Sequence, residues 1–135
     1  MNNSKILNTK YEVPNKFKVR SSKQYNLEDR TLEFGKRIIQ LCKSLPKNTV
    51  NFKLIDQLVR SGTSVGANYR EANETDTKRD FRNRIRIAKK EAKETGYWLE
   101  LIAEANPGLK SKIGYLVKES RELMKILAAI YEKTK

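Results

Sequence analysis

Apolar residues near the start of the chain recur at alternating spacings of four and three, which is the pattern of a helix that packs one face against its neighbours. Asn26 can cap this helix by accepting a hydrogen bond from the backbone N–H of Asp29, and Glu28 adds negative charge at the positive end of the helix dipole. Pro46 ends the helix. The apolar face consists of Leu27, Thr31, Phe34, Ile38, Leu41 and Leu45.

A second helix is predicted to begin between Asn48 and Asn51. Gly62 and Gly66 lie on its apolar face, and because each glycine costs about 1 kcal/mol in a helix, a helix that keeps both gains from close approach of another backbone. A break at 61–63 is the alternative, but the apolar register continues across the glycines and favours one helix. The face consists of Leu54, Ile55, Leu58, Val59, Val65, Tyr69 and Ala72.

Two further helices complete the pattern. The polar segment 73–77 predicts a turn, with Thr75 or Thr77 capping a third helix that runs to about Asn106. Its core face consists of Phe81, Ile85, Ala88, Ala92, Thr95, Leu99 and Ile102. Pro107 and Gly108 close it, and a last helix over about 111–132 is apolar around more than half of its circumference.

Four helices joined by short loops predict an all-α fold, an antiparallel up-down-up-down four-helix bundle over residues 26–135. No segment alternates apolar and polar residues between turn signals, so no strand competes. Residues 1–25 contain six Lys or Arg against the single acid Glu12 and show no helical or strand period. We expect them to form a basic, flexible arm outside the bundle.

Some apolar residues lie away from the predicted core faces. Leu32 and Ile39 are about 120° to 140° from the first helix's seam, at about 100° per residue. The surplus apolar positions predict a homo-oligomer, with an interface formed by Leu32, Ile39, Ile87, Trp98 and Leu101. The alternative is that these are scattered surface residues, which are normal on a monomer.

Composition narrows the chemistry. The 135 residues carry a net charge of +13, one cysteine and no histidine, which excludes an intrachain disulfide, a histidine-based triad and a His/Cys zinc site. Cys42 fits a small buried hydrophobe. Without a signal-peptide core or a membrane-length apolar run, we expect a soluble, cytoplasmic, non-enzymatic protein with no cofactor, no metal and no membrane contact. Its partners should be acidic.

Most of the charge lies in two segments. Residues 1–25 have a net charge of +5, and residues 78–93 carry eight Lys or Arg against Asp80 and Glu91. A helical projection of the second segment places five cations within an arc of about 80°, forming a basic ridge about 22 Å long on the side away from Trp98. The ridge consists of Lys78, Arg82, Arg86, Lys89 and Lys93. Such a ridge spans several phosphates; the alternative is a solvated face balanced by nearby acids. No aromatic residue interleaves it, so base stacking is not indicated.

A polar line borders the predicted core between the second and third helices. It consists of Arg60, Ser64, Asn68 and Glu71 on the second helix with Glu91 and Glu94 on the third. Arg60 paired with one of these glutamates would be a half-buried charge bridge that fixes register. An acid and base pair is the other interpretation, but the sequence supplies no nucleophile, metal or substrate pocket beside it.

Two separated signatures resemble a known family. The string from Arg60 to Ala72 (RSGTSVGANYREA) and the string from Ile87 to Leu101 (IAKKEAKETGYWLEL), with Asp80 and Phe81 between them, are similar to the four-helix-bundle proteins encoded in intervening sequences of bacterial 23S ribosomal RNA genes. The likeness covers about residues 27–132.

The resemblance implies a bundle that assembles into a ring of five subunits, with a charged surface suited to nucleic acid. Related proteins include accessory variability proteins of diversity-generating retroelements, which bind a reverse transcriptase and its template RNA. The first hypothesis is therefore an oligomeric protein that binds RNA or DNA through the ridge. The alternative is a protein-interaction adaptor, for example for a reverse transcriptase, whose charge serves solubility or steering.

Overall fold

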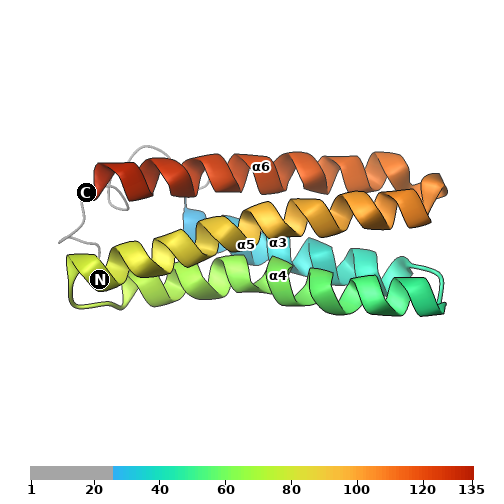
Figure 1. Ribbon diagram of the computed structural model, residues 1–135, viewed down its shortest axis with the longest axis horizontal. Helices are drawn as coiled ribbons and strands as arrows, with labels where there is room; N and C mark the ends of the chain where they lie inside the picture. Colours follow the sequence, from blue (N-terminus) through green and yellow to red (C-terminus); the bar gives the residue numbers. More distant parts are fainter. Residues whose placement is uncertain (1–25) are drawn as a thin grey trace.

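A computed structural model describes residues 26–135, so the basic arm proposed for 1–25 lies outside the described residues. Four α-helices follow one another in this part of the chain: α3 (Leu27–Ser44), α4 (Thr49–Asn73), α5 (Lys78–Ala105) and α6 (Lys110–Lys133). A single 3-10 turn, η1 (Pro107–Leu109), joins the last two. Consecutive helices run antiparallel and side by side (Figure 1), which confirms the predicted up-down-up-down bundle.

Side-chain caps fix where three helices begin. Asn26 accepts a hydrogen bond from the backbone N–H of Asp29 (3.2 Å), as predicted, and Asn48 does the same for Asn51 (2.8 Å). Of the two candidate caps for the third helix, Thr77 is the one used, accepting from the backbone N–H of Asp80 (3.1 Å). These bonds satisfy donors that have no partner within the first turn of a helix.

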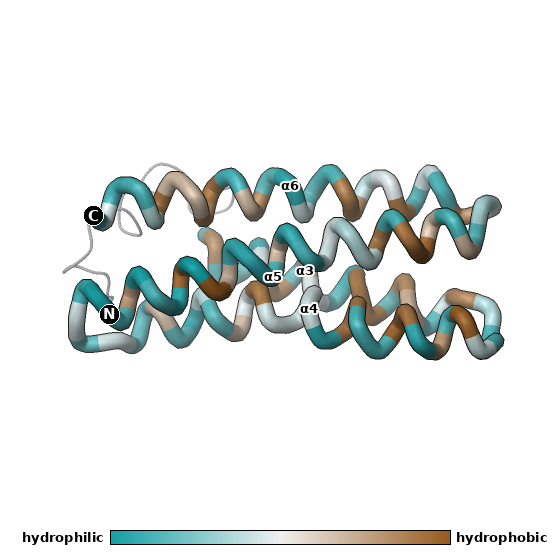
Figure 2. The backbone as a smooth tube through the Cα atoms, viewed as in Figure 1, coloured by the Kyte–Doolittle hydropathy of each residue, from teal (hydrophilic) through white to brown (hydrophobic). Residues whose placement is uncertain are grey.

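The predicted core faces of the first and third helices point inward. Every member of the first helix's seam is buried, as is every member of the third helix's face. Of the face predicted for the second helix, Leu58, Val65, Tyr69 and Ala72 are buried, whereas Leu54, Ile55 and Val59 are half-buried. Figure 2 shows the apolar colours recurring once per turn along each helix, with hydrophilic colours over the first turns of α5. On α6 the buried apolar side chains are Ile113, Leu116, Val117, Leu123, Leu127 and Ile130.

Helix α4 is continuous across its two glycines, which confirms the first of the two interpretations. A Cβ atom placed on Gly62 would lie 3.0 Å from Cγ1 and 3.1 Å from Cγ2 of Ile38. On Gly66 it would lie 3.0 Å from Oγ1 of Thr31. The missing side chains therefore let α3 approach α4 closely, so the helix-propensity cost is offset by packing.

A buried pair of amides joins the first turn of α4 to Asn106, the residue that caps the end of α5. Nδ2 of Asn51 donates to Oδ1 of Asn106 (3.1 Å), and Nδ2 of Asn106 donates back to Oδ1 of Asn51 (2.9 Å). The same Nδ2 atoms also reach the carbonyl oxygens of Pro46 and Ile102, at 2.8 and 2.9 Å. Both amide oxygens and both nitrogens thus have partners, as buried polar groups require.

Candidate functional site

The five cations of the ridge lie along the edge of α5 that faces α6. Lys78, Arg86 and Lys93 are exposed, whereas Arg82 and Lys89 are half-buried. None of the helices among residues 26–135 is long and apolar enough to cross a membrane.

Tyr131 of α6 lies against the middle of the ridge. The guanidinium carbon of Arg82 is 3.8 Å from the centre of the Tyr131 ring, and Nζ of Lys89 is 5.2 Å from it. Nε and Nη2 of Arg82 also donate to the carbonyl oxygen of Tyr131, at 3.4 and 3.3 Å. An aromatic ring therefore does interleave the cations, contrary to the prediction. It comes from another helix, so the pattern of α5 alone could not show it.

The N-terminal part of the ridge borders an open cleft of about 970 Å³ between the start of α5 and the last turn of α6. Lys78, Arg82 and Arg86 line it. Arg79 lines it too, although the helical projection left Arg79 outside the ridge. Nζ of Lys78 donates to the main-chain oxygen of Lys135 (2.7 Å), and Nη2 of Arg86 donates to Oδ1 of Asn83 (2.9 Å).

The predicted charge bridge of the polar line is present, with two acceptors in place of one. Nη1 of Arg60 lies 3.3 Å from Oε1 of Glu91, and Nη2 lies 2.9 Å from Oε2 of Glu94. Burial by itself would raise the pKa of Glu94, but the hydrogen bond and charge of Arg60 outweigh it and lower that pKa below its usual value. The hydrogen bond to Glu94 in turn raises the pKa of Arg60.

The remaining members of the polar line do not join this cluster. Asn68 accepts a hydrogen bond from Nη1 of Arg84 (3.1 Å), a partner that the sequence pattern did not reveal. The hydroxyl of Ser64 donates to the carbonyl oxygen of Arg60, and Glu71 is exposed. The line therefore contains two α4–α5 pairings, at Arg60 and at Asn68, whereas Ser64 bonds within α4. Residues 26–135 contain no group of three or more acidic or cysteine side chains placed to hold a metal ion.

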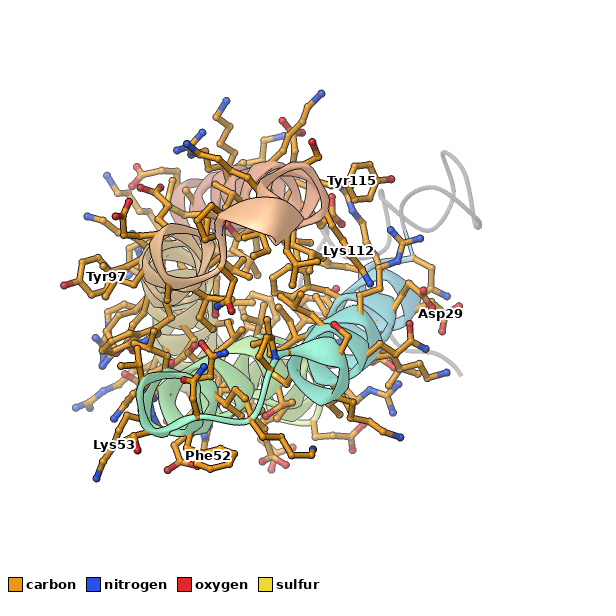
Figure 3. All side chains as sticks on the ribbon, turned by 90° about the vertical axis from the view of Figure 1, so that its right-hand side faces the viewer. Asp29, Phe52, Lys53, Tyr97, Lys112 and Tyr115 are labelled. Atoms are coloured by element: carbon orange, nitrogen blue, oxygen red, sulfur yellow. The ribbon has the colours of Figure 1, made fainter. Side chains whose placement is uncertain are left out.

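The predicted interface residues divide by exposure. Leu32 and Ile39 are 44% and 43% exposed, whereas Ile87, Trp98 and Leu101 are half-buried. Leu32 and Ile39 line a groove of about 320 Å³ between α3 and α4. Figure 3 shows other outward-pointing aromatic side chains, Phe52, Tyr97 and Tyr115, each on a different helix. Cys42 is half-buried, and burial raises the pKa of its thiol to about 11.

The described chain is thus an antiparallel four-helix bundle with one edge of α5 paired to α4 through acids and the other edge cationic. A model of the 23S rRNA-intervening sequence protein family matches residues 23–129, and the chain belongs to that family. A solved structure supports the assignment. It is a protein of unknown function from the S23 ribosomal protein family of Bacteroides thetaiotaomicron VPI-5482, 40% identical, with a TM-score of 0.71 over 77% of this chain and 96% of that one. Comparison with curated proteins gave no match.

Proposed function

We propose that this chain is a non-enzymatic, oligomeric nucleic-acid-binding protein, with RNA the favoured ligand, and that the basic ridge contacts phosphates. The proposal rests mainly on the direction in which two acids of α5, Glu91 and Glu94, point. Glu91 and Glu94 face α4 and are paired with Arg60, so they are not available to balance the ridge on the opposite edge. This weighs against a merely solvated, internally neutralised face.

The packing of Arg82 against Tyr131 adds to the argument. Its guanidinium is held against Tyr131, so it loses less side-chain entropy on binding a phosphate than an unrestrained arginine would. Two acids lie beside the ridge. Asp80 of α5 lines the same cleft as Lys78, Arg82 and Arg86. The pKa of Glu132 of α6 is lowered by the hydrogen bond and charge of Lys135 first and by the charges of Arg82 and Lys89 after that. Two carboxylates beside five cations leave most of the ridge charge uncompensated.

The proposal is tested by fluorescence titration of a labelled single-stranded RNA at increasing salt. Five phosphate contacts give a logarithmic salt slope of about −3.5, so affinity should fall about 100-fold between about 50 and 200 mM salt. Affinity that changes little over this range would contradict phosphate binding. The variant Arg86→Glu/Lys93→Glu should lose binding, because both side chains are exposed ridge cations that leave the Tyr131 contact intact.

The matched control is Lys110→Glu/Lys112→Glu. It makes the same change in net charge at the start of α6, on exposed residues at the opposite end of the bundle from the start of α5 (Figure 1). An equal loss of binding in both variants would show that net charge alone governs affinity and would refute a role for the ridge. Circular dichroism of each variant tests whether its helicity is kept.

We also propose that copies of the chain associate through the apolar positions outside the core, in the ring of five subunits that the family resemblance implies. The exposure of Leu32 and Ile39 supports this association, because the two residues are seven positions apart and so lie on the same face of α3. Light scattering of Leu32→Glu/Ile39→Glu should then give a smaller mass than the unaltered chain. A single-chain mass for the unaltered protein would contradict association.

The same exposed face supports a second candidate function, a protein-interaction adaptor such as an accessory factor for a reverse transcriptase. In that case Leu32→Glu/Ile39→Glu would abolish capture of the partner, and the ridge variant would not. Partner binding by a chain with no affinity for nucleic acid would favour the adaptor over the first proposal.

A further inference from the structure

The cationic cleft at the start of α5 differs from the rest of the ridge in shape and in charge density. It holds about 970 Å³ between the first turns of α5 and the last turn of α6, which lie at the same end of the bundle (Figure 1). Three arginines line it, Arg79, Arg82 and Arg86, and Asp80 is the only carboxylate side chain among its described lining residues. The other end of the ridge, at Lys89 and Lys93, lies outside this cleft.

We propose that this cleft binds a terminal phosphoryl group, such as the 5′-phosphate of a nucleic-acid strand whose backbone follows the basic ridge. The inference rests on the proposed function and specifies which part of the strand this site takes. Lys78 is already hydrogen-bonded to the main-chain oxygen of Lys135, so we assign no contact to it.

Charge matching favours a strand end over an internal phosphate. The five lining cations Lys78, Arg79, Arg82, Arg86 and Lys135 against Asp80 give a local side-chain charge of about +4, of which a phosphomonoester carrying about −1.5 to −2 near pH 7 neutralises a large part. An internal phosphodiester carries one negative charge and would leave more of this local charge unbalanced than a phosphomonoester does. The dipole of α5, whose positive end lies here, adds to the same potential.

The arginines are also suited to the geometry of a phosphoryl group. Guanidinium groups bind phosphate oxygens through two parallel hydrogen bonds, which lysine cannot do. Arg82 uses Nε and Nη2 towards the carbonyl oxygen of Tyr131, and Arg86 uses Nη2 towards Asn83, so these hydrogen bonds do not engage Nη1 of either arginine. Arg79, one residue into α5, approaches from the neighbouring face.

The test compares two short single-stranded RNAs of one sequence, labelled at the 3′ end and carrying either a 5′-phosphate or a 5′-hydroxyl. We expect the phosphorylated strand to bind about tenfold more tightly at the same salt. Equal affinities would overturn the inference and leave the proposed function standing. If neither strand binds at low salt, both the inference and the proposed function fail.

Matched variants locate the preference within the ridge. Arg79→Gln and Arg86→Gln should each reduce the preference for the 5′-phosphate, because both side chains line the cleft. Lys93→Gln removes one charge outside the cleft and should weaken both strands equally, leaving the ratio unchanged. A preference that survives Arg79→Gln/Arg86→Gln, or that falls equally in Lys93→Gln, would place the terminal phosphate elsewhere and overturn the inference.

Competition distinguishes the two sources of such a group. Pyrophosphate added to the bound 5′-phosphorylated RNA should reduce its affinity to that of the 5′-hydroxyl strand if the cleft also accepts a free anion. No effect of pyrophosphate, together with a preserved tenfold preference, assigns the site to strand ends. Equal displacement of both strands would show only ionic screening and would count against a distinct phosphoryl site.

Discussion

The same substitution, glycine to alanine, should have opposite effects at two positions of this bundle. Gly62 lies within α4 facing Ile38, and Gly114 lies in α6 with no atom within 4 Å of an added Cβ. At Gly114 the methyl group adds helix propensity without a clash, so Gly114→Ala should stabilise the fold by about 0.5–1 kcal/mol.

At Gly62 the added methyl meets the branch point of Ile38. Its contacts of 3.0, 3.1 and 3.4 Å are to Cγ1, Cγ2 and Cβ, and Ile38 is fully buried. A β-branched side chain in a helix has one strongly preferred rotamer, so Ile38 cannot rotate away and the helices must separate. Overpacking of this kind costs about 1–3 kcal/mol. Since the gain in helix propensity is only about 1 kcal/mol, Gly62→Ala should be net destabilising, by up to about 2 kcal/mol.

The free energy of unfolding, measured by urea denaturation at one protein concentration, tests both values. A double-mutant cycle with Ile38→Ala isolates the contact: in that background Gly62→Ala should stabilise, because the new methyl enters vacated space. The reasoning is refuted if Gly62→Ala raises the stability of the unaltered chain as much as Gly114→Ala does.

Three other predictions follow from single interactions. Asn51→Ala should lower the free energy of unfolding by about 1–3 kcal/mol, because it leaves amide groups of Asn106 without partners. Adding Asn106→Ala to that variant should lower it much less, as measured by the same urea denaturation. Because the pKa of Glu94 is lowered in the folded chain, its pairing stabilises the fold above the ordinary glutamate pKa of about 4.3, and this stability is lost as the pH falls through the folded-state pKa. Glu94→Gln should therefore lose less stability than the unaltered chain between pH 7 and about pH 3. Equal losses in the two proteins would contradict the pairing. The thiol of Cys42, with a pKa of about 11, should react slowly with a disulfide reagent at pH 8 until urea unfolds the chain.

The helices of this bundle could be predicted from sequence because their determinants are local. Asn26 and Thr77 are of residue types that cap helices, and each stands directly before the helix whose backbone N–H it accepts from. The apolar seam from Leu27 to Leu45 has the spacing of a single helix face. The glycines of α4 could be recognised as sites of close approach because the apolar register continued through them, although their partners on α3 could not be named.

The residues missed were those whose partners lie far along the chain. Tyr131 reaches the ridge from 49 residues beyond Arg82, and Asn51 pairs with Asn106 across 55 residues. The residues around Tyr131 and Asn51 in the sequence give no sign of these contacts. Tyr131, for example, has the spacing of one more member of the apolar arc of the last helix. Arg79 could not be predicted for a different reason. A helical projection of α5 alone does not show the cleft, which forms because the end of α6 lies beside the start of α5.

The two edges of α5 explain why stability and binding should be separable in this protein. Acids on the edge facing α4 pair with Arg60, so a change there alters helix packing and leaves the cationic edge intact. On the other edge the separation is incomplete, because Arg82 both hydrogen-bonds the last turn of α6 and belongs to the ridge. Loss of Arg82 would therefore combine the cost of a lost helix-end contact with any loss of affinity. Arg86 and Lys93, which are exposed and make no contact with Tyr131 comparable to that of Arg82, report on binding alone.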